Sequence, residues 1–487
     1  MGLMPDRNAC LSALNTGFFV LNPVFPVLNS TFLSALSAFS AVNLFTNIHR
    51  GARGDRGGKA GVVMGLMPDR NACLSVLNPV FPVLNSAFNS ALSACSAVNL
   101  FPFVARAGLL PIRSSMNPLA LTCPTVRRIG ILTSGGDCPG LNAVIRAVAR
   151  DAFHCAIKVI GIEDGYLGLI ENRFRELTEA DMAGLLLRGG TILGSNNKTN
   201  PSRHKIGTDS DNRPIYKDVM PDCIRNLERA GVEALITIGG DGTQTGATEF
   251  AKKGIPVIGV PKTIDNDIEG TEITFGFQTA VATATDALDK VRTTADSHHR
   301  AMVVEVMGRN AGWIALHAGV ASGSDAILLP ELPFEMKRVF DLVKERSERG
   351  KRSSLICVSE GAKVKGHGQF VARRIETSPD PIRLGGIAKY IAEQIEDETG
   401  VESRYTILGH TQRGGTPIPS DRVLATLLGS HAMTLLREGK AGRMVAIQKG
   451  QLTDVDLSFA AGKQRLVKED DPLILAARNL GTIFGDE

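Results

Sequence analysis

Short apolar runs alternate with amphipathic segments from Arg127 onward, and this alternation limits the possible folds more than any other feature. Seven runs rich in β-branched residues are expected to be buried strands: 127–134, 155–164, 234–241, 256–263, 300–308, 325–331 and 353–361. Segments between them, such as 279–294 and 340–350, have helical spacing. Strand, loop and helix in repeated order predict doubly wound α/β layers, which bind ligands at the carboxyl ends of their strands.

The composition indicates a soluble, globular chain. It has 487 residues, of which 43% are hydrophobic and 21% charged, and this length allows two or three domains of roughly 150 residues each. The formal net charge of +4 is small and dispersed, which argues against nucleic acid as a partner. No apolar run reaches the roughly 18 residues of a membrane-spanning helix. The eight cysteines form no CxxC pair, so we expect free thiols.

Residues 1–125 form a low-complexity extension that repeats itself. The stretch "MGLMPDRNACLS" at Met1 recurs at Met64, but a solenoid needs about three repeats to bury a continuous core. Three interpretations remain: a transit segment, a disordered extension, or translated upstream sequence ahead of a true start at Met116. The expected compartment is the cytoplasm, or a plastid if the segment directs import.

Two glycine-rich loops follow predicted strands. Gly135 and Gly136 lead into a helix, and in such a loop backbone N–H groups and the helix dipole bind phosphate. Asp241 lies among the glycines of "IGGDGT". A carboxylate there can hold the Mg²⁺ of a nucleotide, or it can simply form an Asx-type turn.

A third loop, "PKTIDND", brings Asp265 and Asp267 close together. In an extended loop the two carboxylates would face the same side, where one can abstract a proton while the other assists a metal. Basic side chains near later strand ends favour a phosphorylated substrate, because guanidinium binds phosphate bidentately. These side chains are Arg300, Arg309, Arg404, His410 and Arg413.

The motifs "GILTSGGDCPGLNAVIR", "IGGDGT", "PKTIDNDI", "VVEVMGR" and "LGHTQRGGTP", in this order, resemble the 6-phosphofructokinase family from Arg127 to the C-terminus. "GGDGT" alone is also similar to NAD kinases and diacylglycerol kinases, which lack the other motifs. The resemblance implies transfer of the γ-phosphoryl group of MgATP to the 1-hydroxyl of fructose 6-phosphate. A catalytically silent subunit would be marked by loss of Asp241, Asp265 or Arg309, and all three are present.

The resemblance also implies a role for each candidate residue. Asp265 would be the base for the sugar hydroxyl, and Asp241 the Mg²⁺ ligand. Thr263, Arg309 and the Gly135 backbone would stabilise the transferring phosphoryl group. The implied ATP contacts are Gly135, Asn197, Lys198, Gly240, Asp241, Gly242 and Thr243. The implied sugar-phosphate contacts are Thr263, Asp265, Asp267, Met307, Gly308, Arg309, Glu360, His410 and Arg413, with Arg300 and Arg404 reaching from a neighbouring subunit of a homotetramer or homodimer.

Two positions bear on the phosphate donor. ATP enzymes of the family carry glycine at the position of Gly242, whereas pyrophosphate enzymes carry aspartate, which would fill the space of the α-phosphate and repel it. At Lys262 the pyrophosphate enzymes carry lysine, so the pattern here is mixed. We expect ATP, with Lys262 swinging aside, and keep pyrophosphate as the alternative. Lys198 is expected to replace, as a point charge, an arginine that ATP enzymes often place against the nucleotide.

The family fold implies two doubly wound, Rossmann-like lobes with the active site in the cleft between them. The expected nucleotide lobe covers 126–277 and 411–462, and the expected sugar-phosphate lobe covers 278–410 and 463–487, with a helix near 473–479. A group of cations lies at or near the positions of the effector pocket in bacterial members of the family. One interpretation is activation by ADP and inhibition by phosphoenolpyruvate; the other is that these side chains are solvated helix cations. They are Arg146, Arg150, Arg188, Arg292, Arg349 and Lys351, with Asp325 where a metal-binding acid is usual.

Overall fold

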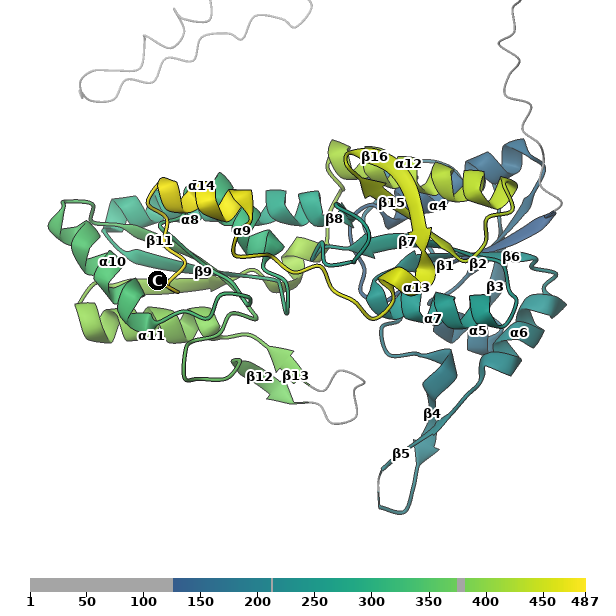
Figure 1. Cartoon of the computed structure of the whole chain (residues 1–487), viewed down its shortest axis with the longest axis horizontal. Helices are drawn as coiled ribbons and strands as arrows, with labels where there is room; N and C mark the ends of the chain where they lie inside the picture. Colours follow the sequence, from purple (N-terminus) through teal and green to yellow (C-terminus); the bar gives the residue numbers. More distant parts are fainter. Residues whose placement is uncertain (1–125, 212, 375–381) are drawn as a thin grey trace, which may run out of the picture. The chain divides into compact units, whose positions relative to one another are not determined.

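The protein was analysed as a computed structural model that describes residues 126–487, apart from residues 212 and 375–381. The predictions for residues 1–125 lie outside the described residues. The described residues belong to one compact unit. Its described part contains two separate sheets with helices on both faces of each (Figure 1). The predicted class, α/β with two doubly wound layers, is therefore confirmed.

The larger sheet holds the candidate glycine loops. Its strands run in the order β16-β15-β7-β6-β1-β2-β3, with β8 beside β7. The strands from β15 to β2 are parallel to their neighbours, whereas β3 and β16 are antiparallel edges. The bounds are β1 Arg128–Ser134, β2 Lys158–Ile162, β3 Phe174–Leu177, β6 Ala234–Gly239, β7 Val257–Thr263, β8 Phe275–Gly276, β15 Arg443–Gln448 and β16 Gln451–Asp456.

Helices cover both faces of this sheet, which explains why its central strands read as continuous apolar runs. Every residue of β6 is buried. The helices α4 (Leu141–His154) and α12 (Pro419–Arg437) lie on one face in Figure 1. The other face carries α5 (Tyr166–Glu171), α6 (Met220–Arg229), α7 (Asp241–Lys252) and α13 (Leu457–Ala460).

The smaller sheet is parallel throughout, in the order β10-β11-β9-β14. Its strands are β9 Ala301–Val306, β10 Ala326–Leu328, β11 Ser354–Ser359 and β14 Ser403–Ile407. Its helices are α8 Phe277–His298, α9 Trp313–Ala321 and α14 Pro472–Asn479 on one face, and α10 Met336–Glu348 and α11 Ile387–Thr399 on the other (Figure 1). The predicted C-terminal helix is confirmed as α14.

All seven predicted strands are present as β1, β2, β6, β7, β9, β10 and β11. Three antiparallel hairpins were not predicted: β15 with β16, β4 (His204–Thr208) with β5 (Pro214–Lys217), and β12 (Val371–Arg374) with β13 (Ile382–Leu384). Short 3₁₀ turns complete the described fold: η1 Ala180–Met182, η2 Leu185–Leu187, η3 Pro201–Arg203 and η4 Gly409–Arg413. The boundaries of the two lobes remain predictions.

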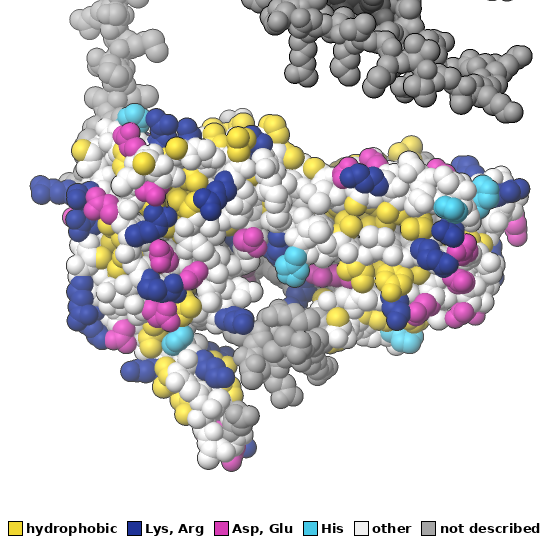
Figure 2. Space-filling view, turned by 180° about the vertical axis from the view of Figure 1, so that it is seen from behind, with side chains coloured by type: hydrophobic (Ala, Val, Ile, Leu, Met, Phe, Trp, Pro, Cys, Tyr) yellow, Lys and Arg dark blue, Asp and Glu magenta, His cyan; other side chains and the backbone are white. Residues whose placement is uncertain are grey.

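Basic and acidic side chains are interspersed over the face seen in Figure 2, without one single-signed field. Among the helices that the structure describes, none is both long and apolar enough to cross a bilayer.

Candidate active site

Two cavities meet beside the carboxyl ends of β1, β6 and β7. The first cavity measures about 310 Å³, and the second about 450 Å³, sizes typical of small-molecule sites. The first is lined by the glycine loops and residues 196–200, and the second adds residues from loops that follow strands of the smaller sheet. Gly136, Asn197, Asp265 and Arg413 line both. Asp265 therefore lies where a group could pass from one cavity to the other.

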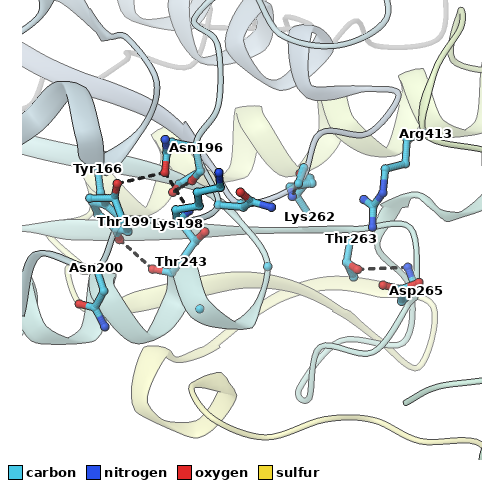
Figure 3. Close-up of a pocket in the computed structure, with 16 residues that line it drawn as sticks. Tyr166, Asn196, Lys198, Thr199, Asn200, Thr243, Lys262, Thr263, Asp265 and Arg413 are labelled. Carbon is cyan, nitrogen blue, oxygen red and sulfur yellow. Dashed lines mark hydrogen bonds between the residues drawn. The ribbon is translucent and has the colours of Figure 1, made fainter. Parts of the chain in front are cut away.

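The first cavity has a lining that suits a phosphate group. Gly135, Gly136 and the first turn of α7 line it, so a helix N-terminus borders the ligand space. Gly135 has φ +85°, which glycine adopts without strain, and its N–H donates to the Asn196 carbonyl at 3.1 Å. Figure 3 shows Asn196, Lys198 and Thr199 at one end of this cavity and Thr263, Asp265 and Arg413 at the other.

Gly242 is an open position in this cavity. It is the second residue of α7, and a Cβ added there would meet no atom within 4 Å. Its φ lies outside the left-handed region, so other residues can adopt its backbone conformation. Glycine at this place keeps space open rather than relieving a crowded or strained backbone.

Lys262 does not need to swing aside, which corrects the expectation from the sequence. Its side chain is buried, and its ammonium group donates to the Gly136 carbonyl. Burial lowers the pKa of Lys262, while the nearby Asp265 charge raises it. The ammonium group thus lies against the loop after β1 and leaves the space beside Gly242 empty.

The turn after β7 is not extended, contrary to the prediction, because Asn266 has φ +52°. The Asn266 carboxamide accepts from the Thr274 N–H at 2.9 Å and so holds this left-handed residue. Asp265 then lines both cavities, whereas Asp267 lines neither. The Thr263 hydroxyl connects the two aspartates, since it accepts from the Asp265 N–H at 3.1 Å and bonds to the Asp267 carboxylate.

Asp265 has the titration behaviour of a general base near neutral pH. Burial and, as the second cause, the Asp267 charge raise the pKa of its carboxyl to about 6, against the opposing effect of Arg413 and Lys262. A carboxylate of this pKa is ionised at neutral pH and is a stronger base than an ordinary aspartate.

The second cavity combines cations with acids. Met307, Arg309, Glu360, His410 and Arg413 line it as predicted, together with Asp137 and Leu384. Burial raises the pKa of Glu360 to about 7, and the Asp265 charge adds to this shift. Guanidinium groups beside hydrogen-bonding carboxyls suit a sugar phosphate, with the phosphate on the arginines and hydroxyls on the acids.

Asp241 and Asp267 line neither cavity, but both lie within two residues of positions that line the first one. The Asp241 Oδ1 atom accepts from the Gly462 N–H at 2.6 Å, and the Asp267 Oδ2 atom accepts from Gln464 at 2.9 Å. Burial raises the pKa of Asp267, and the Asp241 charge contributes to that shift. Two nearby carboxylates suit a hard cation such as Mg²⁺. The described residues include no cluster of three ligating side chains, so phosphate and water would complete the coordination.

Four predicted sugar-phosphate residues line neither cavity: Asp267, described above, and Arg300, Gly308 and Arg404. Gly308 has φ +141°, and a Cβ there would lie 2.5 Å from the Ser359 hydroxyl, so glycine is required between Met307 and Arg309. Arg300 precedes β9 and Arg404 begins β14, and both pair with Glu402 at 2.8 and 2.5 Å. They lie at the amino ends of strands whose carboxyl ends face the second cavity.

Sequence reasoning missed Tyr166, which lines the first cavity, and Asn266, which shapes the turn after β7. Tyr166 is buried, and its hydroxyl donates to the Thr243 carbonyl at 2.7 Å, which holds the first turn of α7 (Figure 3). No local motif marks it. Asn266 carried a usable signal, since asparagine between two aspartates favours a left-handed turn.

The predicted effector cations fall in separate cavities. Arg146 and Arg150 line one beside η2, while Arg349, Lys351 and Asp325 line another near α14. The Asp325 carboxylate pairs with Arg292 at 3.2 Å and Arg346 at 2.8 Å. Regulation by ADP and phosphoenolpyruvate remains a prediction.

Comparison with known proteins agrees with this geometry. The phosphofructokinase family matches residues 128–436. The chain belongs to that family. An ATP-dependent 6-phosphofructokinase 2 of Clostridium perfringens is 47% identical over 363 residues, which are 74% of this chain and 99% of that protein.

A pyrophosphate–fructose 6-phosphate 1-phosphotransferase of Amycolatopsis methanolica is 46% identical over 341 residues, 70% of this chain and 97% of that protein. Among solved structures, the Pichia pastoris phosphofructokinase in the T-state aligns with a TM-score of 0.59 and 31% identity, over 69% of this chain and 35% of that chain. This chain thus matches about a third of the Pichia chain.

Proposed function

We propose that this phosphofructokinase is an ATP-dependent 6-phosphofructokinase, which makes fructose 1,6-bisphosphate and ADP from fructose 6-phosphate and MgATP. The observation that carries the proposal is the position of Asp265, which lines both the phosphate-binding first cavity and the cationic second cavity. The sugar would occupy the second cavity and the nucleotide the first, so its γ-phosphoryl group would lie beside this carboxylate.

In this mechanism Asp265 takes the proton of the sugar 1-hydroxyl, whose oxygen attacks the γ-phosphorus. Arg309 and Thr263 would neutralise and orient the phosphoryl group as it moves. The Gly135 N–H already donates to the Asn196 carbonyl, so Gly135 is proposed to shape the loop rather than to donate to the phosphoryl group. Lys262, anchored on the Gly136 carbonyl, adds a fixed positive charge in the first cavity. Phosphoryl transfer depends mainly on such positioning and charge neutralisation.

Mg²⁺ is the proposed cofactor, with Asp241 as its ligand and Asp267 assisting. When bound, it would neutralise charge on the donor phosphates. The Asp241 Oδ1 atom is already engaged by Gly462, so Oδ2 is the atom proposed to face the ion.

ATP is the proposed donor because Gly242 leaves open space in the first cavity. The relatives support this choice: proteins named for ATP are 47% and 48% identical, and a protein named for pyrophosphate is 46% identical. The pyrophosphate-dependent reaction is the second candidate, and Lys262 is the residue that favours it.

The sugar phosphate would also be held from a neighbouring subunit by Arg300 and Arg404. Both cations lie at strand ends opposite to those facing the second cavity, which supports their action on another copy of the chain. We therefore propose a homo-oligomer, a tetramer or a dimer. The cytoplasm is the proposed compartment, with a plastid as the alternative.

Formation of fructose 1,6-bisphosphate by the full chain, measured with Mg²⁺ and either ATP or pyrophosphate, tests the proposal. We expect turnover with ATP and little with pyrophosphate. Turnover with pyrophosphate alone would show that Lys262 outweighs Gly242. No turnover with either donor would overturn the phosphofructokinase activity itself.

The pH dependence of the reaction should follow Asp265. Its carboxyl must be ionised to accept a proton, and its pKa is raised to about 6. The rate is therefore expected to fall as the pH drops through that value and to level off above it. A kcat/KM profile for fructose 6-phosphate measures this, and a flat profile between about pH 5 and pH 7 would contradict the assignment.

A further inference from the structure

Residues 462–467, named here the C-terminal strap, connect α13 on the larger sheet to the segment that leads into α14 on the smaller one. Figure 1 shows this yellow segment passing between the two groups of helices. It lies nearly 200 residues beyond the catalytic turn in sequence, yet an isolated bridge pairs Gln464 with Ile268. The strap therefore runs along the turn that carries both catalytic aspartates.

The strap binds the two carboxylate-bearing loops through its backbone. The Gly462 N–H donates to Asp241 Oδ1 at 2.6 Å, and the Arg465 N–H donates to the Asp267 carbonyl at 2.8 Å. Gly462 has φ +74°, a left-handed conformation that glycine adopts freely. These bonds fix the strap against the loops without using a side chain of its own.

Gln464 adds a bridge made by its side chain. Its Nε2 atom donates to Asp267 Oδ2 at 2.9 Å, and its Oε1 atom accepts from the Asn310 side chain at 3.0 Å. A carboxylate can only accept, so the Asp267 contact determines which end of the Gln464 amide faces it. A carboxamide has both the donor and the acceptor that these two partners require. Asn310 directly follows Arg309.

The far end of the strap is anchored to the smaller sheet. The Trp313 indole N–H donates to the Arg465 carbonyl at 2.9 Å, and the Arg465 guanidinium lies 4.1 Å from the centre of that ring. The Val467 N–H donates to Glu331 at 2.9 Å. Trp313 is the single tryptophan of the chain, so its fluorescence reports whether the strap stays docked.

We infer that Gln464 is a positioning residue. It joins the carboxylate of Asp267, which is proposed to assist the metal, to the loop that carries Arg309, which lines the second cavity. This inference rests on the proposed function. Gln464 and Asn310 are exposed, so their hydrogen bonds add little to folding stability. Their role is to orient catalytic groups, because the bridge sets the direction of the Asp267 carboxylate and the distance between the loops that carry Asp267 and Asn310.

The test replaces Gln464 in the full chain. Gln464→Leu removes both hydrogen bonds at similar size, and we expect kcat to fall about 10- to 100-fold, the effect of misplacing a catalytic group by roughly 1 Å. KM for ATP and for fructose 6-phosphate should change less than about threefold, since Gln464 lines neither cavity. Asn310→Ala should show the same pattern, and the double variant should be no worse than either single one.

Lys463→Met is the matched control. Lys463 lies on the same strap, but its ammonium group lies 4.6 Å from the Phe459 ring centre and away from the bridge. The control should keep the wild-type kcat. The Trp313 emission maximum and the unfolding midpoint should be unchanged in all of these variants, because the backbone bonds and the Trp313 contact keep the strap docked.

Two results would overturn the inference. One is a Gln464→Leu enzyme with wild-type kcat. The other is a loss of kcat accompanied by a red-shifted Trp313 emission or a lower unfolding midpoint, which would mean that Gln464 only holds the strap in place. A wild-type chain inactive with both donors would instead refute the proposed function, and Trp313 emission can still be measured in that case.

Discussion

Asp265→Asn is expected to lower kcat about 10²- to 10⁴-fold, the usual contribution of a positioned general base. Asparagine has nearly the same shape but cannot accept the proton of the sugar hydroxyl. The backbone bond from residue 265 to the Thr263 hydroxyl does not involve the replaced group, so the turn should keep its conformation. Steady-state kinetics with ATP and fructose 6-phosphate measure the change.

Stability provides the control for this variant. Burial raises the pKa of Asp265, so the folded protein holds the charged form at a cost, and a neutral amide relieves it. The unfolding midpoint at neutral pH should therefore be equal to or above that of the wild type. A kcat within about threefold of wild type would remove Asp265 from its proposed role, whereas a lower midpoint would attribute the loss to misfolding.

The strands and their loops could be predicted because their signals are local. A run such as 234–239 is buried on both faces of a parallel sheet, so its residues are apolar throughout. The carboxyl ends of such strands meet at one edge of the sheet. The sequence therefore predicts that the loops at Gly135, Asp241 and Asp265 lie close together.

The details that the sequence did not reveal depend on long-range contacts. The direction of Asp267 depends on the left-handed Asn266 and on Gln464, whose partners are far away in the chain. Lys262 was expected to be flexible because lysine usually is, but the Gly136 carbonyl and the surrounding burial fix it. The edge pair β15–β16 and the hairpin β4–β5 escaped prediction, since strands with exposed residues lack the continuous apolar pattern.

The second large effect concerns the choice of phosphate donor at Gly242. Gly242→Asp should fold normally, because the added Cβ meets no atom within 4 Å and an acid in the first turn of α7 interacts favourably with the helix dipole. Its carboxylate would project into the first cavity, where the α-phosphate of ATP is proposed to lie. Like charges about 4 Å apart repel by roughly 4 kcal/mol at an effective dielectric constant near 20, close to a thousandfold in binding.

We therefore expect kcat/KM for ATP to fall on the order of 10³-fold in Gly242→Asp, with use of pyrophosphate retained or gained, since pyrophosphate has no α-phosphate and no nucleoside. Gly242→Asn separates charge from size, because asparagine fills the same space without a carboxylate. The fall in kcat/KM for ATP in this variant therefore measures the steric contribution alone. Lys262→Gly should not restore ATP use to Gly242→Asp, because the Lys262 ammonium group lies on the Gly136 carbonyl and not beside residue 242. If Gly242→Asp keeps the wild-type kcat/KM for ATP, the open space at this position does not select the donor, and the choice must be sought at Lys262.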